Sequence, residues 1–309
     1  MSRKVLITAA IDNYIQNRFE ALAFEVDVKP DIERTDLLAI IANYEILIIT
    51  TYTKVDNVLI DNALNLKIVA RLGSGMENVD VDYCKLKNIH CLSSPEGNAN
   101  AVGEHCLAML LNLLNNINKA NNELKNNLFL REENRGEELD GKTIGIIGYG
   151  HTGQAFAKKL RGFDVEILVY DKYKPAQDVF IKRVSLDALQ KSSDVISFHV
   201  PYNKETHHFC TTDFLKNCTK YPVIINTSRG AIVNTLDIAT ALETNTIKGL
   251  CIDVFEDEPI TKQAIHPIER YQQLLSLDNV IATPHIAGWT KESKFKLAKI
   301  LMDKIEQLL

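Results

Sequence analysis

Short runs of strand-forming residues alternate with helical patterns along the first 95 residues of the chain. The candidate strands are residues 4–8, 24–28, 45–50, 66–71 and 89–92. Helical patterns lie between them, for example over residues 34–44 and 54–64. Alternation of strands and helices predicts a parallel β-sheet with helices on both faces.

A second strand–helix series follows a long helical pattern. Residues 98–125 contain no proline and predict one long helix, and a charge-dense stretch over residues 126–142 follows it. The candidate strands of the second series are residues 142–148, 165–171, 194–200, 221–227, 248–255 and 279–285. Residues 291–309 end the chain with apolar positions at helical spacing. We therefore expect two doubly wound α/β units with a break near residue 98.

Composition and charge narrow the class of protein. The 309 residues suffice for two ordinary domains, and 46% hydrophobic with 24% charged residues is typical of a globular protein. A net charge of −5 gives no reason to expect a nucleic acid or an anionic membrane as partner. No apolar run approaches the roughly 20 residues of a membrane span, and the N-terminal run is too short for a signal peptide. Six cysteines without zinc-like spacing indicate free thiols in a cytoplasmic protein.

A glycine-rich motif opens the second series. Gly148, Gly150 and Gly153 form GxGxxG between a candidate strand and a helical pattern, with His151 and Thr152 inside the motif. This arrangement binds the pyrophosphate of a dinucleotide at a helix N-terminus.

The next candidate strand ends in Asp171, eighteen residues after Gly153. A carboxylate there accepts the ribose hydroxyls and repels a 2′-phosphate, which favours NAD over NADP. Lys172 and Lys174 follow shortly after and would favour NADP, because a lysine can neutralise a phosphate.

Three later candidate strands are followed by polar residues suited to the chemistry of a hydroxy acid. Arg229, Glu258 and His285 each come shortly after such a strand, and ligands of α/β proteins collect at the carboxyl ends of strands. A guanidinium binds a carboxylate and a carbonyl oxygen, a histidine exchanges a proton with a hydroxyl group, and a glutamate stabilises the imidazolium. Taken singly, each residue has a plain alternative, such as a surface cation or a local hydrogen bond. Together, downstream of the glycine motif, they predict a catalytic site.

The motifs resemble those of the D-isomer-specific 2-hydroxyacid dehydrogenases, especially the phosphoglycerate dehydrogenase branch. The resemblance runs through "RLGSGMENVD", "GNANAVGEHCLAMLL", "GIIGYGHTGQAFAKKL", "INTSRGAIVN", "IDVFEDEP" and "TPHIAGW" and covers nearly the whole chain. It implies a flavodoxin-like substrate domain (residues 1–98 and 287–309), an NAD-binding Rossmann domain (residues 99–286), a cleft between the two and a homodimer. The chain ends soon after its last predicted helix, so we expect no C-terminal regulatory domain.

The resemblance also implies roles for individual residues. Arg229, Glu258 and His285 match the family's catalytic set, and the backbone N–H groups of Ser74 and Gly75 are expected to hold the substrate carboxylate. The further residues expected at the cofactor are Thr227, Asp253, Ala287 and Gly288.

The substrate is less well specified than the reaction. The resemblance favours 3-phosphoglycerate and 3-phosphohydroxypyruvate, a pair that belongs to serine biosynthesis. The family's phosphoglycerate enzymes usually carry an arginine after the strand at 45–50, whereas this chain offers only Lys54 there. Either Lys54 binds the phosphate, or Arg131 or Arg135 does, or the substrate is an unphosphorylated acid such as glycerate, hydroxypyruvate or lactate. A dinucleotide-sensing scaffold like the family's corepressor relatives is the rival from another class, but it would not need a proton donor.

The remaining histidines carry no comparable signal. His207 and His208 are adjacent, so their side chains diverge, and no acidic cluster accompanies them; we expect no metal site. His199 is expected either at the cofactor or in a local hydrogen bond, and His105 in the core or an interface.

Overall fold

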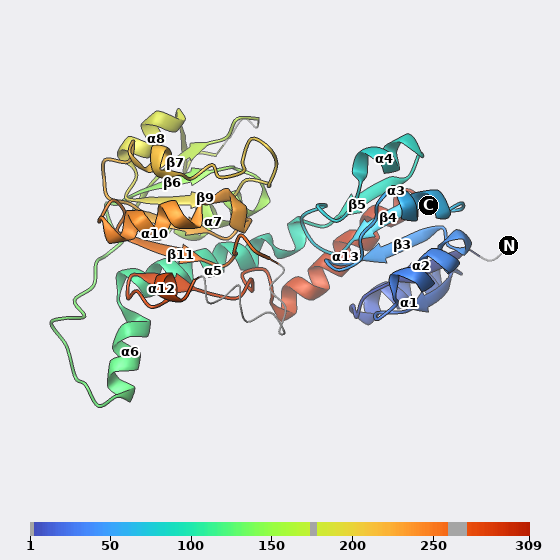
Figure 1. The fold of residues 1–309 in the computed structure, drawn as a ribbon, viewed down its shortest axis with the longest axis horizontal. Coiled ribbons are helices and arrows are strands. Elements are labelled where there is room, and N and C mark those ends of the chain that lie inside the picture. The colour runs from blue at the N-terminus through green and yellow to red at the C-terminus, as the bar shows by residue number, and fades with distance from the viewer. Residues whose placement is uncertain (1–2, 174–177, 259–270) are drawn as a thin grey trace. The chain divides into compact units, whose positions relative to one another are not determined.

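The chain folds into two α/β units. The computed structural model describes residues 3–173, 178–258 and 271–309. One unit comprises Met1–Ala99 with Trp289–Leu309, and the other comprises Asn100–Gly288. We call them the split unit and the middle unit. Each contains one sheet whose paired strands are all parallel, which confirms the predicted fold class (Figure 1).

The sheet of the split unit has the order β2-β1-β3-β4-β5, which is the order of flavodoxin-like folds. Its strands are β1 (Lys4–Ile7), β2 (Glu25–Val28), β3 (Ile46–Ile49), β4 (Ile68–Arg71) and β5 (His90–Ser93). Its helical segments are α1 (Asn13–Ala21), α2 (Arg34–Ile40), η1 (Ile41–Asn43), α3 (Asn57–Asn62), α4 (Val81–Leu86) and α13 (Lys291–Glu306). Successive residues of a strand point to opposite faces, so both faces carry a core.

Helix α13 returns from the end of the chain to one face of this sheet. Its Leu301 and Ile305 are fully buried in one cluster with Val5 and Ile7 of β1. The opposite face buries Leu6 of the same strand together with residues of α2 and α3. The C-terminal residues therefore complete the core of a sheet that begins with residue 4.

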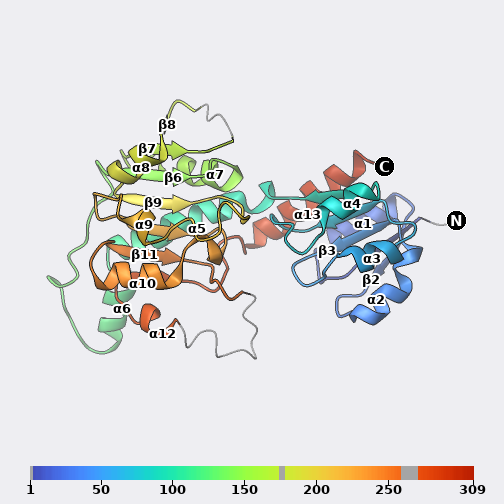
Figure 2. The same cartoon turned by 45° about the horizontal axis from the view of Figure 1, so that its top comes forward.

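The sheet of the middle unit has the order β12-β11-β10-β9-β6-β7-β8. Its strands are β6 (Thr143–Ile147), β7 (Glu166–Tyr170), β8 (Lys182–Arg183), β9 (Val195–Phe198), β10 (Val223–Asn226), β11 (Gly249–Ile252) and β12 (Val280–Ala282). The chain runs outward from β6 to one edge and then returns to the other side of β6, so the strand order reverses there. Ligands bind at such a switch point. The edge strand β8, absent from the predicted strands, has two exposed residues and no apolar pattern (Figure 2).

Helices cover both faces of this second sheet. One core contains Leu110 and Phe156, and the other contains Phe214 and Ile238. The helical segments are α5 (Glu96–Leu114), α6 (Ile117–Lys125), α7 (His151–Leu160), α8 (Leu186–Ser192), α9 (Thr212–Leu215), η2 (Gly230–Ile232), α10 (Thr235–Glu243) and α12 (Gln272–Leu275).

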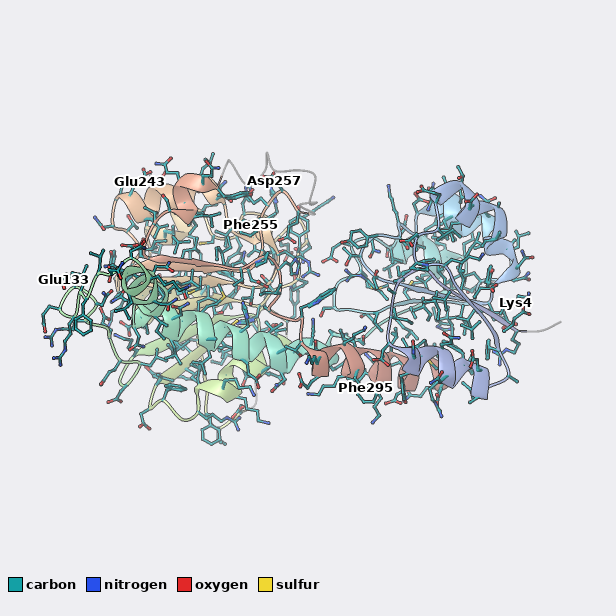
Figure 3. The ribbon with its side chains drawn as sticks, turned by 90° about the horizontal axis from the view of Figure 1, so that it is seen from below. Lys4, Glu133, Glu243, Phe255, Asp257 and Phe295 are labelled. Atoms are coloured by element: carbon teal, nitrogen blue, oxygen red, sulfur yellow. The ribbon has the colours of Figure 1, made fainter. Side chains whose placement is uncertain are left out.

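The prediction of a single helix over residues 98–125 is wrong. The helix ends at Leu114, and Asn116 adopts a left-handed backbone with φ of 51°, a conformation that asparagine tolerates better than most residues. Helix α6 and the segment after it then project from the middle unit; Glu133, labelled in Figure 3, lies in that segment. Neither α5 nor any other helix of the described residues is long and apolar enough to cross a membrane.

Candidate active site

The glycine motif forms a tight turn between β6 and α7. Gly148 has a φ of 91°, and a Cβ atom there would lie 2.6 Å from the carbonyl oxygen of His199. A Cβ atom on Gly153 would lie 2.2 Å from the carbonyl oxygen of Gly148. Only glycine therefore fits at either position. Helix α7 begins at His151, and its N-cap residue Gly150 has no side chain to cap it; the N-terminus of a helix is a place where an anion can bind.

The carboxylate of Asp171 is fixed beside this turn. Its Oδ2 accepts a hydrogen bond from the N–H of Tyr149 at 2.7 Å, and its Oδ1 accepts one from the N–H of Tyr173 at 2.9 Å. Each carboxylate oxygen can accept a further bond. The glycine turn, the open helix N-terminus and this carboxylate thus fit the pyrophosphate and ribose of NAD.

Arg229 lies in a turn that follows β10. The side chain of Asn226 holds this turn: its Oδ1 accepts from the N–H and hydroxyl of Ser228, and its Nδ2 donates to the carbonyl oxygen of Arg229 at 2.9 Å. A Cβ atom on Gly230 would lie 2.0 Å from the carbonyl group of Phe255. Because Gly230 has no side chain, the turn that carries Arg229 can pack directly on the loop that carries Glu258.

His285 and Glu258 form a directly bonded pair. The Oε2 of Glu258 contacts the Nδ1 of His285, while its Oε1 accepts the N–H of Phe255 at 2.8 Å. The hydrogen bond to Glu258 raises the pKa of His285 above its ordinary value, against the opposing effects of desolvation and the positive charge of Arg229. The structure thus brings the three residues of the predicted catalytic set together, with the side chain of His285 still 49% exposed.

Asp253 holds the segment that carries His285. The residue is fully buried after β11, and its Oδ1 accepts from the hydroxyl of Thr283 at 2.5 Å and from the N–H of Ile286 at 2.8 Å. Its Oδ2 accepts from the N–H of Ala287 at 2.8 Å. His285 lies between these anchored residues with a left-handed φ of 56°. The Nε2 of His105 contacts the hydroxyl of Thr283 at 2.9 Å.

Sequence reasoning missed these supporting residues. Thr283, Asn226 and Gly230 lie inside motifs that the resemblance covers, but only their hydrogen bonds and close contacts reveal what they do. The predicted cofactor contacts of Asp253, Thr227, Ala287 and Gly288 stay predictions. Thr227 is buried, with its Oγ1 3.2 Å from the Sγ of Cys106.

The predicted substrate residues lie in the split unit. Ser74 and Gly75 follow β4, and no acceptor among the described residues takes a hydrogen bond from their backbone N–H groups. The side chain of Lys54 is 77% exposed, with its Nζ 3.9 Å from Asp56. Arg34 also binds Asp56 through its guanidinium.

The other polar residues are engaged elsewhere. His199 is buried beside Ser197, and burial lowers its pKa to about 3. His208 contacts Glu256 at 2.9 Å and stacks on His207, so the prediction that the side chains of His207 and His208 diverge is wrong. Within the described ranges no group of three or more His, Cys, Asp or Glu side chains could hold a metal ion. Arg135 donates a hydrogen bond to Glu132 at 2.5 Å. Lys174, which was expected to favour NADP, lies outside the described residues.

Comparisons with known proteins cover most of the chain. A family model described as "D-isomer specific 2-hydroxyacid dehydrogenase, NAD binding domain" matches residues 107–287. A hydroxypyruvate reductase from Thermotoga maritima is 36% identical over 89% of this chain and 88% of its own length. A D-3-phosphoglycerate dehydrogenase from Archaeoglobus fulgidus is 32% identical over 98% of this chain, which spans 56% of that relative. The crystal structure of a D-lactate dehydrogenase from Aquifex aeolicus with NAD and lactic acid has a TM-score of 0.82 and 26% identity, covering 99% of this chain and 95% of that one.

Replacing Glu258 by Gln should lower the pKa of His285. The substitution removes the negative charge and the strong acceptor that stabilise the imidazolium. NMR titration of the histidine rings, with His285 assigned through H285Q, measures the change. Glu256→Gln is the matched control, because it alters a glutamate–histidine pair of the same loop and should leave His285 as it is. An unchanged His285 titration in E258Q would show that the pair does not exist in solution.

Proposed function

Because the chain belongs to the D-isomer-specific 2-hydroxyacid dehydrogenase family, we propose that Arg229, Glu258 and His285 catalyse its interconversion of a D-2-hydroxy acid and the corresponding 2-keto acid. Members of this family are NAD-dependent oxidoreductases that act on a CH–OH group. The observation that carries the proposal is the bonded pair of Glu258 and His285, with the charge of Arg229 acting on the same imidazole.

The three side chains have complementary tasks. When bound, NAD would accept the hydride and NADH would donate it. Since the Nδ1 of His285 contacts Glu258, its Nε2 is the nitrogen that exchanges a proton with the substrate oxygen. Glu258 keeps the ring oriented and stabilises its charged form, and the guanidinium of Arg229 stabilises negative charge on the carbonyl oxygen.

We assign NAD binding to the middle unit and substrate-carboxylate binding to Ser74 and Gly75 of the split unit. The backbone N–H groups of these two residues follow β4, where a loop at a strand end can bind an anion. The glycine turn and Asp171 support the first assignment, with Thr227, Asp253, Ala287 and Gly288 as further expected contacts.

The charges around Lys54 favour an unphosphorylated substrate, and we propose hydroxypyruvate and glycerate as the physiological pair. A phosphate dianion calls for several uncommitted cations, but Lys54 and Arg34 share the carboxylate of Asp56. A hydroxypyruvate reductase is among the relatives that this chain matches over most of their length, here 88%. The phosphorylated pair is the second candidate, because Lys54 is exposed and phosphoglycerate dehydrogenases are among the relatives.

Oxidation of NADH should therefore be faster with hydroxypyruvate than with 3-phosphohydroxypyruvate. The assay follows NADH absorbance with both compounds, pyruvate and glyoxylate, and compares kcat/KM. Lys54→Met is expected to leave kcat/KM for hydroxypyruvate unchanged. A preference for the phosphorylated compound that K54M abolishes would establish the second candidate. Absence of turnover with every keto acid would contradict an enzymatic role and favour a dinucleotide-sensing scaffold.

His285→Gln should lose about 10²- to 10⁴-fold in kcat, because glutamine occupies similar space but supplies no titrating proton. NADH binding, followed by the fluorescence of the bound nucleotide, should be retained. His207→Gln removes an exposed histidine of the same unit and serves as the control. A kcat near the wild-type value in H285Q would remove His285 from the mechanism.

We further propose that a second copy of the chain covers the projecting segment of the middle unit. Exposed apolar side chains gather on α6 and the residues after it, and Phe129 is 85% exposed. These residues are Ile117, Leu124, Leu128, Phe129 and Leu130. Exposed apolar groups in such number mark interaction surfaces. This supports the homodimer that the family resemblance implies.

The double variant L124D/F129D should convert the dimer into a monomer, because a charged group in an apolar interface loses its hydration. Sedimentation velocity gives the mass of each species. Leu64→Asp is the control, since Leu64 is 81% exposed in the split unit. A wild-type protein that sediments as a monomer, or a dimer that survives the double substitution, would contradict the proposal.

A further inference from the structure

Two basic residues are neighbours of Asp171, one in the chain and one through a main-chain hydrogen bond. Lys172 is its neighbour in the chain, and Nη2 of Arg183 donates to the main-chain carbonyl oxygen of Asp171 at 3.0 Å. In dinucleotide-binding folds a carboxylate here binds the ribose of NAD, whereas a cation here accommodates the 2′-phosphate of NADP. The chain therefore carries groups suited to each of the two cofactors at one place.

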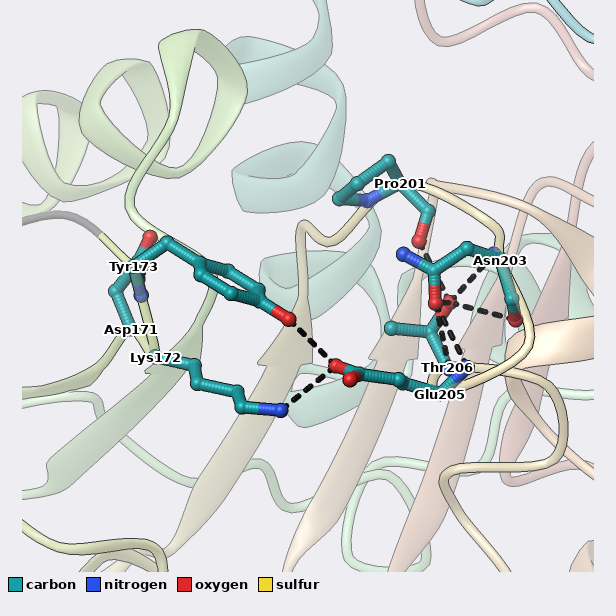
Figure 4. A network of polar contacts seen from close by, with 7 residues as sticks. All are labelled: Asp171, Lys172, Tyr173, Pro201, Asn203, Glu205 and Thr206. Carbon is teal, nitrogen blue, oxygen red and sulfur yellow. Dashed lines mark hydrogen bonds and ion pairs between the residues drawn. The ribbon is translucent and has the colours of Figure 1, made fainter.

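Glu205 engages the nearer cation. Its Oε2 lies 2.8 Å from Nζ of Lys172 and accepts the hydroxyl of Tyr173 at 2.6 Å (Figure 4). The hydrogen bond between them raises the pKa of Lys172 and lowers the pKa of Glu205, so both groups are charged near neutral pH. Glu205 thereby joins the segment after β9 to the residues that follow Asp171.

The backbone that presents Glu205 is fixed by its own turn. Oδ1 of Asn203 accepts the N–H groups of Glu205 at 2.8 Å and Thr206 at 3.1 Å. The hydroxyl of Thr206 donates to the carbonyl oxygen of Pro201 at 2.7 Å and accepts the N–H of Asn203 at 2.8 Å. These bonds fix the backbone at Glu205, and none of them involves Lys172.

We propose that Glu205 is a cofactor-specificity residue, which disfavours NADP(H) by holding the ammonium group of Lys172 and by placing a negative charge beside the ribose site. The inference rests on the assignment of the ribose to Asp171. Both effects weaken binding of a 2′-phosphate. The ammonium of Lys172 is no longer available as its countercharge, and the carboxylate of Glu205 repels it in addition to that of Asp171. Exposed ion pairs are individually weak, so we expect a shift of about five- to tenfold and not a complete change of cofactor.

The test compares nucleotide binding by wild type and Glu205→Gln. Fluorescence titrations with NADH and NADPH give the ratio of the two Kd values without any turnover, and kcat/KM with each nucleotide is measured in parallel. In E205Q the ratio should move about five- to tenfold toward NADPH. The double variant E205Q/K172M should give a ratio between those of E205Q and wild type, because the released ammonium is then absent while the repelling carboxylate is still missing.

Two further variants make the outcomes distinct. Asp187→Asn removes another exposed carboxylate that pairs with a lysine, on α8, and should leave the ratio unchanged. Asp171→Asn should weaken NADH binding and thereby tests the ribose assignment itself. An unchanged ratio in E205Q, or a shift in E205Q/K172M as large as that in E205Q, which would leave no part for the ammonium of Lys172, would overturn the proposal. Unaltered NADH binding in D171N would instead overturn the cofactor site on which the inference rests.

Discussion

The buried carboxylate of Asp253 sets the geometry on which the candidate catalytic site depends. A carboxylate without solvent is costly unless hydrogen bonds satisfy its oxygens. Here the hydroxyl of Thr283 and the N–H groups of Ile286 and Ala287 satisfy them. All three donors come from residues 283–287, around His285. The hydrogen bonds to the carboxylate therefore fix the backbone conformation of this segment. A left-handed residue in such a segment costs about 1–3 kcal/mol and persists because the surrounding bonds require it. The backbone position of His285 therefore depends on Asp253, which follows β11, while Glu258 contacts its ring.

Two glutamates of the middle unit have the same structural role. Each is fixed by hydrogen bonds and restrains a cationic or titrating partner from another segment. Glu258 accepts the N–H of Phe255 and contacts His285, and Glu205 follows the turn of Asn203 and holds Lys172. Fixing the acid matters because a flexible carboxylate loses conformational entropy whenever it pairs. The first pair raises the pKa of a ring, whereas the second pair engages the ammonium group of Lys172.

The sequence allows the prediction of those features that local patterns carry. Apolar runs indicate the buried strands, and the glycines at 148 and 153 are required by backbone contacts that any Cβ atom would violate. Residues at the ends of parallel strands share one edge of the sheet, which is why Arg229, Glu258 and His285 could be grouped before the structure was known. The break at Asn116 could not be predicted, because the apolar pattern continues across it. The pairing of Lys172 with Glu205, 33 residues apart, depends on the strand order β9-β6-β7, which no periodicity reveals.

The distribution of charge connects the reaction with the size of its substrate. In the middle unit the charges of Glu258, Asp253 and Arg229 all act on the imidazole of His285. In the split unit Lys54 and Arg34 share Asp56, and Nη1 of Arg71 lies 3.8 Å from Glu77, so each of these three cations has an acidic partner. A phosphorylated acid would bring about two further negative charges and would have to separate at least one cation from its acidic partner. This pairing of the cations is the physical reason for our proposal of an unphosphorylated substrate.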